Sequence, residues 1–154
     1  MPSMQNPFEF CRPVAQKSVP AGPDYIHEVK YDGYRGRVVR NGDDVKVFSR
    51  AGLDYTYRYP LIVETARKLK QTQFVVDGEI CVLDVRGISQ FDWLHSGRYN
   101  DDAMFYAFDI VALGGDDLRD LPLVDRKTKL TKLLERRRSG IWSAPYERGE
   151  IGPS

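Results

Sequence analysis

The sequence predicts an α+β domain, built mainly from antiparallel sheets with flanking helices. Residues 36–40 and 45–50 read as two strands on either side of a strong hairpin turn, N-G-D-D, at residues 41–44. Residues 104–113 form a longer apolar run that suits a buried strand. Residues 59–71 carry apolar side chains at helical spacing, which adds a helix beside the strands.

The remaining elements follow from local signals. Residues 1–23 contain five prolines at positions 2, 7, 13, 20 and 23, which favours an extended lead-in over a helix. Residues 25–31 alternate in the manner of a strand. Ser89 is a predicted N-cap for a short helix, and Asp125 is a predicted N-cap for a helix that runs to about Arg138.

Length and charge bound the class of protein. The chain has 154 residues, enough for one domain with its own core, and a formal net charge of +1 argues neither for nor against nucleic acid. Local charge is more informative, because two basic clusters are candidates for phosphate contacts. These clusters are Arg35, Arg37, Arg40, Lys46 and Arg50, and Arg136 to Arg138.

Cysteine usage and hydropathy indicate a cytoplasmic protein. Cys11 and Cys81 lie far apart without metal-site spacing, so we expect free thiols in a reducing compartment. We expect no membrane span and no export signal, because no apolar run approaches the required length.

Residues 28–35, E-V-K-Y-D-G-Y-R, are the predicted chemical centre of the chain. In a strand, Glu28, Lys30 and Asp32 share one face, where a lysine between two carboxylates is costly unless a ligand binds. Arg35 adds a planar fork suited to phosphate or ribose oxygens. The plain alternative is a solvated strand that ends in an ordinary D-G turn.

This stretch resembles the K-x-D-G-x-R signature of ATP-dependent DNA ligases, which RNA ligases and capping enzymes share. The sequence of this stretch is most similar to the ligase domain of bacterial end-joining DNA ligases, and the resemblance extends from about Phe8 to the last residue. It implies that Lys30 is the nucleophile that becomes adenylated.

Three further stretches match motifs of the same family. S-R-A-G at residues 49–52 implies that Arg50 contacts phosphate or DNA, although alone it would read as the end of a strand. D-G-E at residues 77–79 implies that Glu79 faces the nucleotide and binds Mg²⁺ or ribose hydroxyls. Alone, that segment predicts a tight hairpin with a surface glutamate. F-D-I at residues 108–110 implies that Phe108 stacks on adenine, whereas its plain reading is a core side chain.

The resemblance therefore implies that residues 24–154 are the N-terminal part of a nucleotidyltransferase (adenylation) domain, without the oligonucleotide-binding domain that follows it in the family. ATP is the implied cofactor, with Mg²⁺ or Mn²⁺. The implied nucleotide-binding residues are Glu28, Lys30, Arg35, Arg50, Glu79 and Phe108.

In the family, the lysyl-AMP passes AMP to the 5′-phosphate of a nick, and a 3′-hydroxyl then seals the strand. The implied partners are nicked or broken double-stranded DNA and end-joining repair proteins, in DNA repair and recombination.

We find no E-G-[IV] motif followed by the lysines that bind the α-phosphate in the family. The K-x-K triplets at residues 68–70 and 127–129 lie in predicted helices and are not that pair. We therefore expect weak ATP binding and negligible sealing by these residues alone.

Other functions remain open at this stage. An RNA ligase or guanylyltransferase would carry the same signature. A catalytically impaired remnant that only binds nucleotide or DNA, or a decayed gene product that does not fold stably, is the alternative from a different class.

Overall fold

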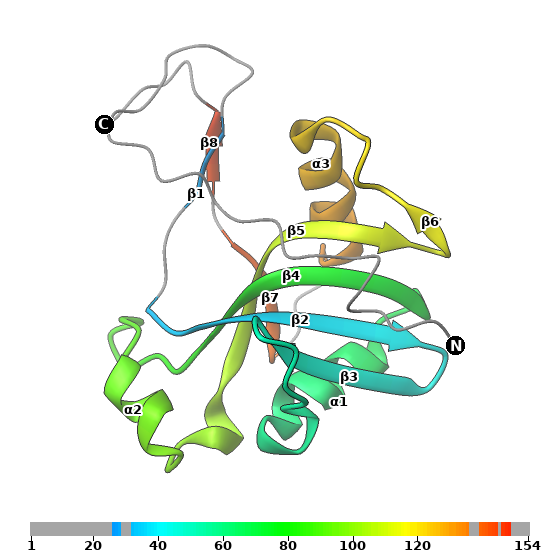
Figure 1. Ribbon diagram of the computed structural model, residues 1–154. Helices are drawn as coiled ribbons and strands as arrows, with labels where there is room; N and C mark the ends of the chain where they lie inside the picture. Colours follow the sequence, from blue (N-terminus) through cyan, green and yellow to red (C-terminus); the bar gives the residue numbers. More distant parts are fainter. Residues whose placement is uncertain (1–25, 29–31, 136–138, 145, 149–154) are drawn as a thin grey trace.

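Figure 1 shows the protein as a computed structural model, which describes residues 26–28, 32–135, 139–144 and 146–148. One sheet has the strand order β3-β2-β4-β5-β6, with β7 beside β5, and β1 and β8 form a separate pair. Neighbouring strands of the larger sheet are antiparallel, except β5 and β7, which are parallel. The strands are β1 (Ile26–Glu28), β2 (Tyr34–Asn41), β3 (Asp44–Ser49), β4 (Gln73–Cys81), β5 (Met104–Leu113), β6 (Asp116–Asp117), β7 (Ile141–Ser143) and β8 (Tyr146–Arg148).

The helices pack around this sheet. α1 packs against β2 and β3, and α3 packs against β5 (Figure 1). They are α1 (Pro60–Lys68), α2 (Phe91–Ser96) and α3 (Leu123–Leu133), with short 3₁₀ turns at Thr56–Arg58 and Asn100–Asp102. The predicted α+β class, with antiparallel sheets and flanking helices, is confirmed. None of the described helices is long and apolar enough to cross a bilayer.

The predicted hairpin between β2 and β3 is confirmed. Asn41 and Asp44 pair across the turn, and Gly42 takes the left-handed conformation, with φ 65°. The predicted strand at residues 104–113 coincides with β5. Of the strand predicted at residues 25–31, β1 covers Ile26–Glu28, and residues 29–31 lie outside the described part.

The hairpin reading of the Asp77-Gly78 pair is wrong, because β4 passes straight through it. Asp77 points to a buried ion pair instead of to solvent. Gly78 is needed because a Cβ there would overlap the carbonyl oxygen of Tyr106 and the ring of Phe105 on the neighbouring strand. A D-G pair therefore marks a close approach of two strands here, not a turn.

Both predicted N-caps are wrong. The Ser89 hydroxyl accepts a hydrogen bond from the backbone N–H of Asp32 at 2.9 Å, and α2 begins after Gln90. α3 begins at Leu123 after Pro122, which places Asp125 within its first turn. A carboxylate there still favours the helix through its dipole.

The main hydrophobic core lies on one face of the sheet. Apolar residues of β2, β4 and β5 pack there against Ile62 and Ala66 of α1 and against Leu69, which directly follows α1. Leu130 of α3 belongs to the same core. A smaller cluster on the other face joins Val39, Val75, Val111 and Ala112, with Phe48 packed against it.

Two arginines of the predicted phosphate-facing cluster are structural. Arg40 is 5% exposed, and its guanidinium donates to the carbonyl oxygens of Ala66 and Leu69 at 2.8 and 2.7 Å. It thereby satisfies the C-terminal end of α1. Arg37 is buried in an ion pair with Asp77. Neither is available to a phosphate, while the second cluster, residues 136–138, lies outside the described residues.

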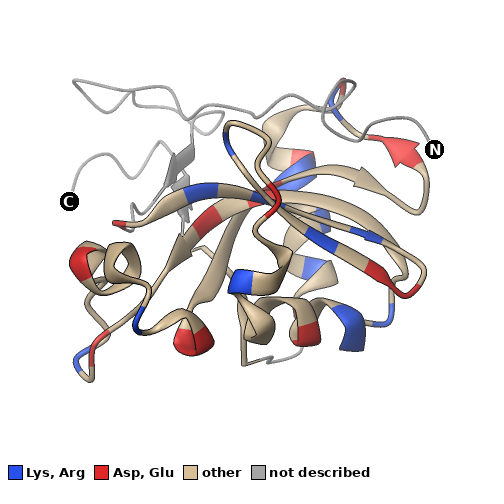
Figure 2. Cartoon of the chain, turned by 60° about the horizontal axis from the view of Figure 1, so that its bottom comes forward, with Lys and Arg blue, Asp and Glu red and all other residues tan. Residues whose placement is uncertain are grey.

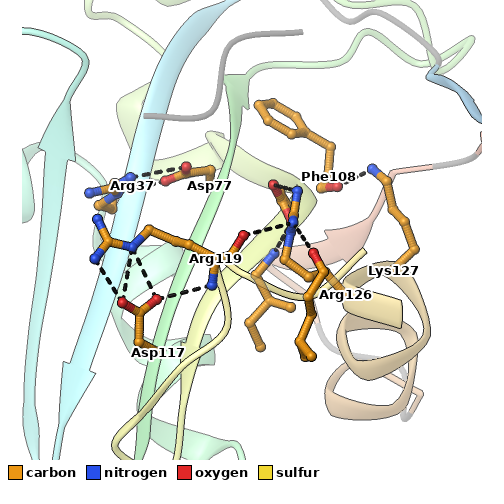
Figure 3. Close-up of polar contacts among 10 residues, drawn as sticks. Arg37, Asp77, Phe108, Asp117, Arg119, Arg126 and Lys127 are labelled. Carbon is orange, nitrogen blue, oxygen red and sulfur yellow. Dashed lines mark hydrogen bonds and ion pairs between the residues drawn. The ribbon is translucent and has the colours of Figure 1, made fainter. Parts of the chain in front are cut away.

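A row of buried charges crosses the middle of the sheet. Arg37, Asp77 and Asp109 occupy paired positions on β2, β4 and β5, and Arg126 of α3 extends the row. Arg37 donates to both carboxylate oxygens of Asp77, at 2.6 and 3.0 Å. Arg126 donates to both oxygens of Asp109, at 2.9 and 3.3 Å. Figure 2 shows that both basic (blue) and acidic (red) residues occur along the strands of the sheet, and Figure 3 shows the bonds of this row.

We predict that Asp77→Ala lowers the free energy of unfolding by roughly 3–5 kcal/mol, because it takes the bidentate acceptor away from a buried guanidinium. Urea denaturation followed by circular dichroism measures the loss. The exposed Asp116→Ala is the control and should change stability by less than about 0.5 kcal/mol. The double variant Arg37→Met/Asp77→Leu should be more stable than Asp77→Ala, and a double variant at least as unstable would contradict the ion-pair account.

Candidate functional site

Arg35, Glu79 and Phe108 come together from three neighbouring strands on the same face of the sheet. Arg35 and Glu79 occupy paired positions on β2 and β4, with Arg35 Nε 3.6 Å from Glu79 Oε1. The Arg35 guanidinium carbon lies 4.7 Å from the centroid of the Phe108 ring. The side chain of Arg35 is only 15% exposed, and that of Glu79 is only 19% exposed. A cation, a carboxylate and an aromatic face thus share one partly buried place.

An irregularity in the sheet brings Phe108 to this place. The pairing of β4 with β5 shifts between Asp77 and Gly78, so that Asp77 pairs with Asp109 while Gly78 pairs with Ala107. Phe108 is the extra residue of this β-bulge. The extra residue lets Phe108 lie under Arg35, while Ala107 belongs to the main core on the opposite face. Bulges of this kind commonly redirect a side chain next to an active site.

α3 supports Phe108 from its backbone side. The ammonium group of Lys127 donates to the carbonyl oxygen of Phe108, and Figure 3 shows this bond beside the Arg126 contacts. Lys127 is 1% exposed, and its Nζ is 5.8 Å from the centroid of the Phe108 ring. Sequence reasoning missed this role, because a lysine in a K-x-K triplet on a helix looks like solvated charge.

The D-G pair of the signature stretch is held at the start of β2. The Asp32 backbone donates to Ser89, and a Cβ at position 33 would overlap the carbonyl oxygen of Ile80. Gly33 is therefore required by a close approach of backbones, and not for a hairpin. Next along β2, the Tyr34 hydroxyl is 2.8 Å from His95 Nδ1. This bond joins the strand that carries Arg35 to α2, and His95 is exposed.

The other predicted site residues are only partly placed. Arg50 is exposed and directly follows β3, whose last residue, Ser49, pairs with Gly36 beside Arg35. Arg50 thus lies at the same end of the sheet as Arg35. Glu28 belongs to β1, and its backbone pairs with Tyr146, but its side chain is outside what the structure describes. Lys30 lies outside the described residues.

The described residues do not by themselves make a metal site. No group of three His, Cys, Asp or Glu side chains suited to a cation occurs among them. Glu79, the predicted metal ligand, faces the guanidinium of Arg35. A divalent cation at Glu79 would need most of its oxygen ligands from a bound phosphate chain and water, which is how Mg²⁺ is commonly held beside nucleotides.

Comparison with known proteins adds the family context. The profile described as "ATP dependent DNA ligase domain" matches residues 10–148. The chain is 30% identical over 146 residues to a DNA ligase of Staphylothermus marinus, covering 86% of this chain and 23% of that protein. It is 33% identical over 122 residues to the multifunctional non-homologous end joining protein LigD of Pseudomonas aeruginosa, covering 77% of this chain and 14% of that protein.

A solved structure agrees with the sequence matches. The ligase domain of LigD from M. tuberculosis superposes with a TM-score of 0.65 at 29% identity, covering 80% of this chain and 41% of that one. A mycobacterial DNA ligase D solved with ATP gives the same TM-score at 28% identity, covering 81% of this chain and 42% of that one. The chain thus spans about a quarter or less of these curated relatives and under half of these structures.

Burial makes one group next to this site inert. Cys81 follows Glu79 on β4, and burial, with a smaller contribution from the Glu79 charge, raises the pKa of its thiol from 9.0 to about 12. We predict that Cys81 in a Cys11→Ser background reacts with a thiol reagent at pH 8 roughly 10³-fold more slowly in the folded protein than in urea, because the thiolate is the reactive form. Absorbance of the released chromophore measures the two rates.

The same shift makes the stability depend on pH. A pKa raised on folding stabilises the protein below the pKa of the unfolded thiol, and this contribution is lost as the pH rises from 9.0 towards 12. Cys81→Ala should flatten that loss. Equal reaction rates in folded and unfolded protein would contradict the burial of this thiol.

Proposed function

The chain belongs to the ATP-dependent DNA ligase family, and from this premise we propose that Lys30 accepts the adenylyl group of ATP and passes it to a 5′-phosphate of DNA. The observation that carries the proposal is the meeting of Arg35, Glu79 and Phe108 on one sheet face. A cation for phosphate, a carboxylate for hydroxyls and an aromatic face for a base are the groups that a nucleoside triphosphate needs.

In the proposed first step, the neutral amine of Lys30 attacks the α-phosphorus. An N–P bond forms, the P–O bond to the β-phosphate breaks, and pyrophosphate leaves with the bonding electron pair. The proton of the attacking amine passes to solvent or to a nearby base. Because an ordinary lysine has a pKa of about 10.4, the surroundings of Lys30 must favour the neutral amine for this attack.

We propose that three of the described residues each bind a different part of the nucleotide. Phe108 stacks on the base, Glu79 accepts hydrogen bonds from ribose hydroxyls, and Arg35 turns towards phosphate oxygens. Glu28 and Arg50 are proposed to lie along the same nucleotide site. Mg²⁺ or Mn²⁺ would neutralise the triphosphate when bound, held mainly by phosphate oxygens, with Glu79 as the proposed carboxylate ligand.

We propose nicked or broken double-stranded DNA as the acceptor. Three similar proteins are named for non-homologous end joining, which supports a role in DNA repair and recombination with end-joining proteins as partners. A cytoplasmic, nucleoid-associated protein would meet this substrate. The chain spans only part of these relatives, so the complete sealing reaction is proposed for these residues together with the remaining parts of a ligase.

We predict that any label transferred to the protein from α-labelled ATP and Mg²⁺ is attached to Lys30, so that Lys30→Ala abolishes the label. Lys68→Ala, which removes an exposed lysine from α1, is the matched control and should leave the labelling unchanged. Label that survives gel electrophoresis and alkali but is released by acid is the measurement, since the P–N bond of a phosphoramidate is hydrolysed in acid. Label that persists in Lys30→Ala would refute the nucleophile, and transfer from labelled GTP in place of ATP would favour a guanylyltransferase.

Phe108→Ala should raise the dissociation constant of ATP by roughly five- to tenfold, the scale of an aromatic stack of about 1 kcal/mol. Calorimetric titration gives the dissociation constant. Tyr57→Ala, which removes an aromatic ring that is 92% exposed and has no place in the proposed site, is the control. Unchanged ATP affinity in a folded Phe108→Ala protein would make Phe108 a packing residue only.

A further inference from the structure

Lys127 has a position that its sequence context does not suggest. It belongs to a K-T-K triplet on α3, and both neighbours in that triplet, Thr128 and Lys129, are exposed. Lys127 itself is 1% exposed. Removing an ammonium group from water is costly, so a buried lysine needs strong acceptors in return.

The ammonium group of Lys127 donates a hydrogen bond to the carbonyl oxygen of Phe108. Phe108 is the extra residue of the β-bulge, so its carbonyl lies where the regular pairing of β4 with β5 is interrupted. A charged donor holding that carbonyl fixes the peptide unit of the bulge, and the peptide unit sets the direction of the Phe108 side chain. The neighbouring Asp109 is held in turn by Arg126, at 2.9 Å.

We propose that Lys127 is a positioning residue that orients the Phe108 ring for nucleotide binding. This inference rests on the proposed function, in which Phe108 stacks on the base. Lys127 acts through the backbone of the bulge and does not touch the phosphates. Two successive residues of α3, Arg126 and Lys127, thereby connect the helix to the two successive residues of the bulge.

The first test reads the orientation of Phe108 without any nucleotide. 4-Fluorophenylalanine is placed at position 108 in the full chain, and its fluorine resonance is recorded by NMR. Lys127→Met keeps the length of the apolar stem but removes the ammonium donor, so the resonance should shift or broaden. Lys129→Met makes the same chemical change two residues along α3, on the exposed surface, and should leave the resonance in place.

The second test is a mutant cycle on ATP affinity, measured by calorimetric titration. Lys127→Met should raise the dissociation constant about fivefold to tenfold, close to the effect of losing the aromatic stack. In the Phe108→Ala background the same change should have almost no effect, because the ring it positions is gone. Lys127→Arg, which restores a charged donor, should recover most of the affinity.

The outcomes separate this inference from the proposed function. An unchanged fluorine resonance in Lys127→Met, or an undiminished loss of ATP affinity in the Phe108→Ala background, would overturn the positioning role. If the wild-type protein binds no ATP, the proposed nucleotide site fails while the fluorine test still decides whether Lys127 orients Phe108. If Lys127→Met does not fold, Lys127→Leu takes its place, since its side chain is apolar and likewise carries no donor for the Phe108 carbonyl.

Discussion

The buried row of charges across the sheet is the constraint on which the arrangement of the site depends. Arg37, Asp77 and Asp109 are taken out of water, and the Arg126 side chain that pairs with Asp109 is only 14% exposed, so each charge must meet its partner in good geometry. A slip of one residue in any strand would turn these side chains to the opposite face, into the main hydrophobic core. The bidentate contacts between Arg37 and Asp77, at 2.6 and 3.0 Å, therefore help to specify the register of β2 against β4. The same register places Arg35 opposite Glu79, two residues along each strand.

The β-bulge in β5 is the second constraint, and it is tied to the first. Asp109 must face Arg126 while Ala107 must face the core, and an extra residue between them satisfies both demands. That extra residue is Phe108, which is directed to the face that carries Arg35. Gly78 on β4 permits the close approach of the two strands, because any side chain there would overlap the backbone of Tyr106. The aromatic residue of the site is thus placed by the pairing of its neighbours.

Much of the fold could be predicted from local patterns, whereas the long-range partners could not. The hairpin at Asn41–Asp44 and the run of β5 follow from turn chemistry and alternation, which act within a few residues. Ser89 has the chemistry of an N-cap, but its hydroxyl is taken by Asp32, 57 residues earlier in the chain. Arg37 and Arg40 read as surface charge because their acceptors, Asp77 and the end of α1, are also distant in sequence. For the site, the family motifs identified Arg35, Glu79 and Phe108, which the structure brings together, while Lys127 had no motif to mark it.

Arg35 and Arg37 lie on the same face of β2, yet their surroundings suit them to different tasks. Arg37 has a bidentate, fully buried acceptor, and moving it would strand two charges in the interior. The contact of Arg35 with Glu79 is longer, at 3.6 Å, between side chains that are 15% and 19% exposed, so it holds Arg35 less firmly than the bidentate contact holds Arg37. Its guanidinium also covers the Phe108 ring, the surface on which the proposed function requires a base to stack. A phosphate offers Arg35 a bidentate, charge-assisted acceptor that is stronger than either of these contacts. In the proposed function, binding of the nucleotide therefore moves Arg35 from Glu79 and Phe108 to a phosphate and uncovers the aromatic face in the same movement.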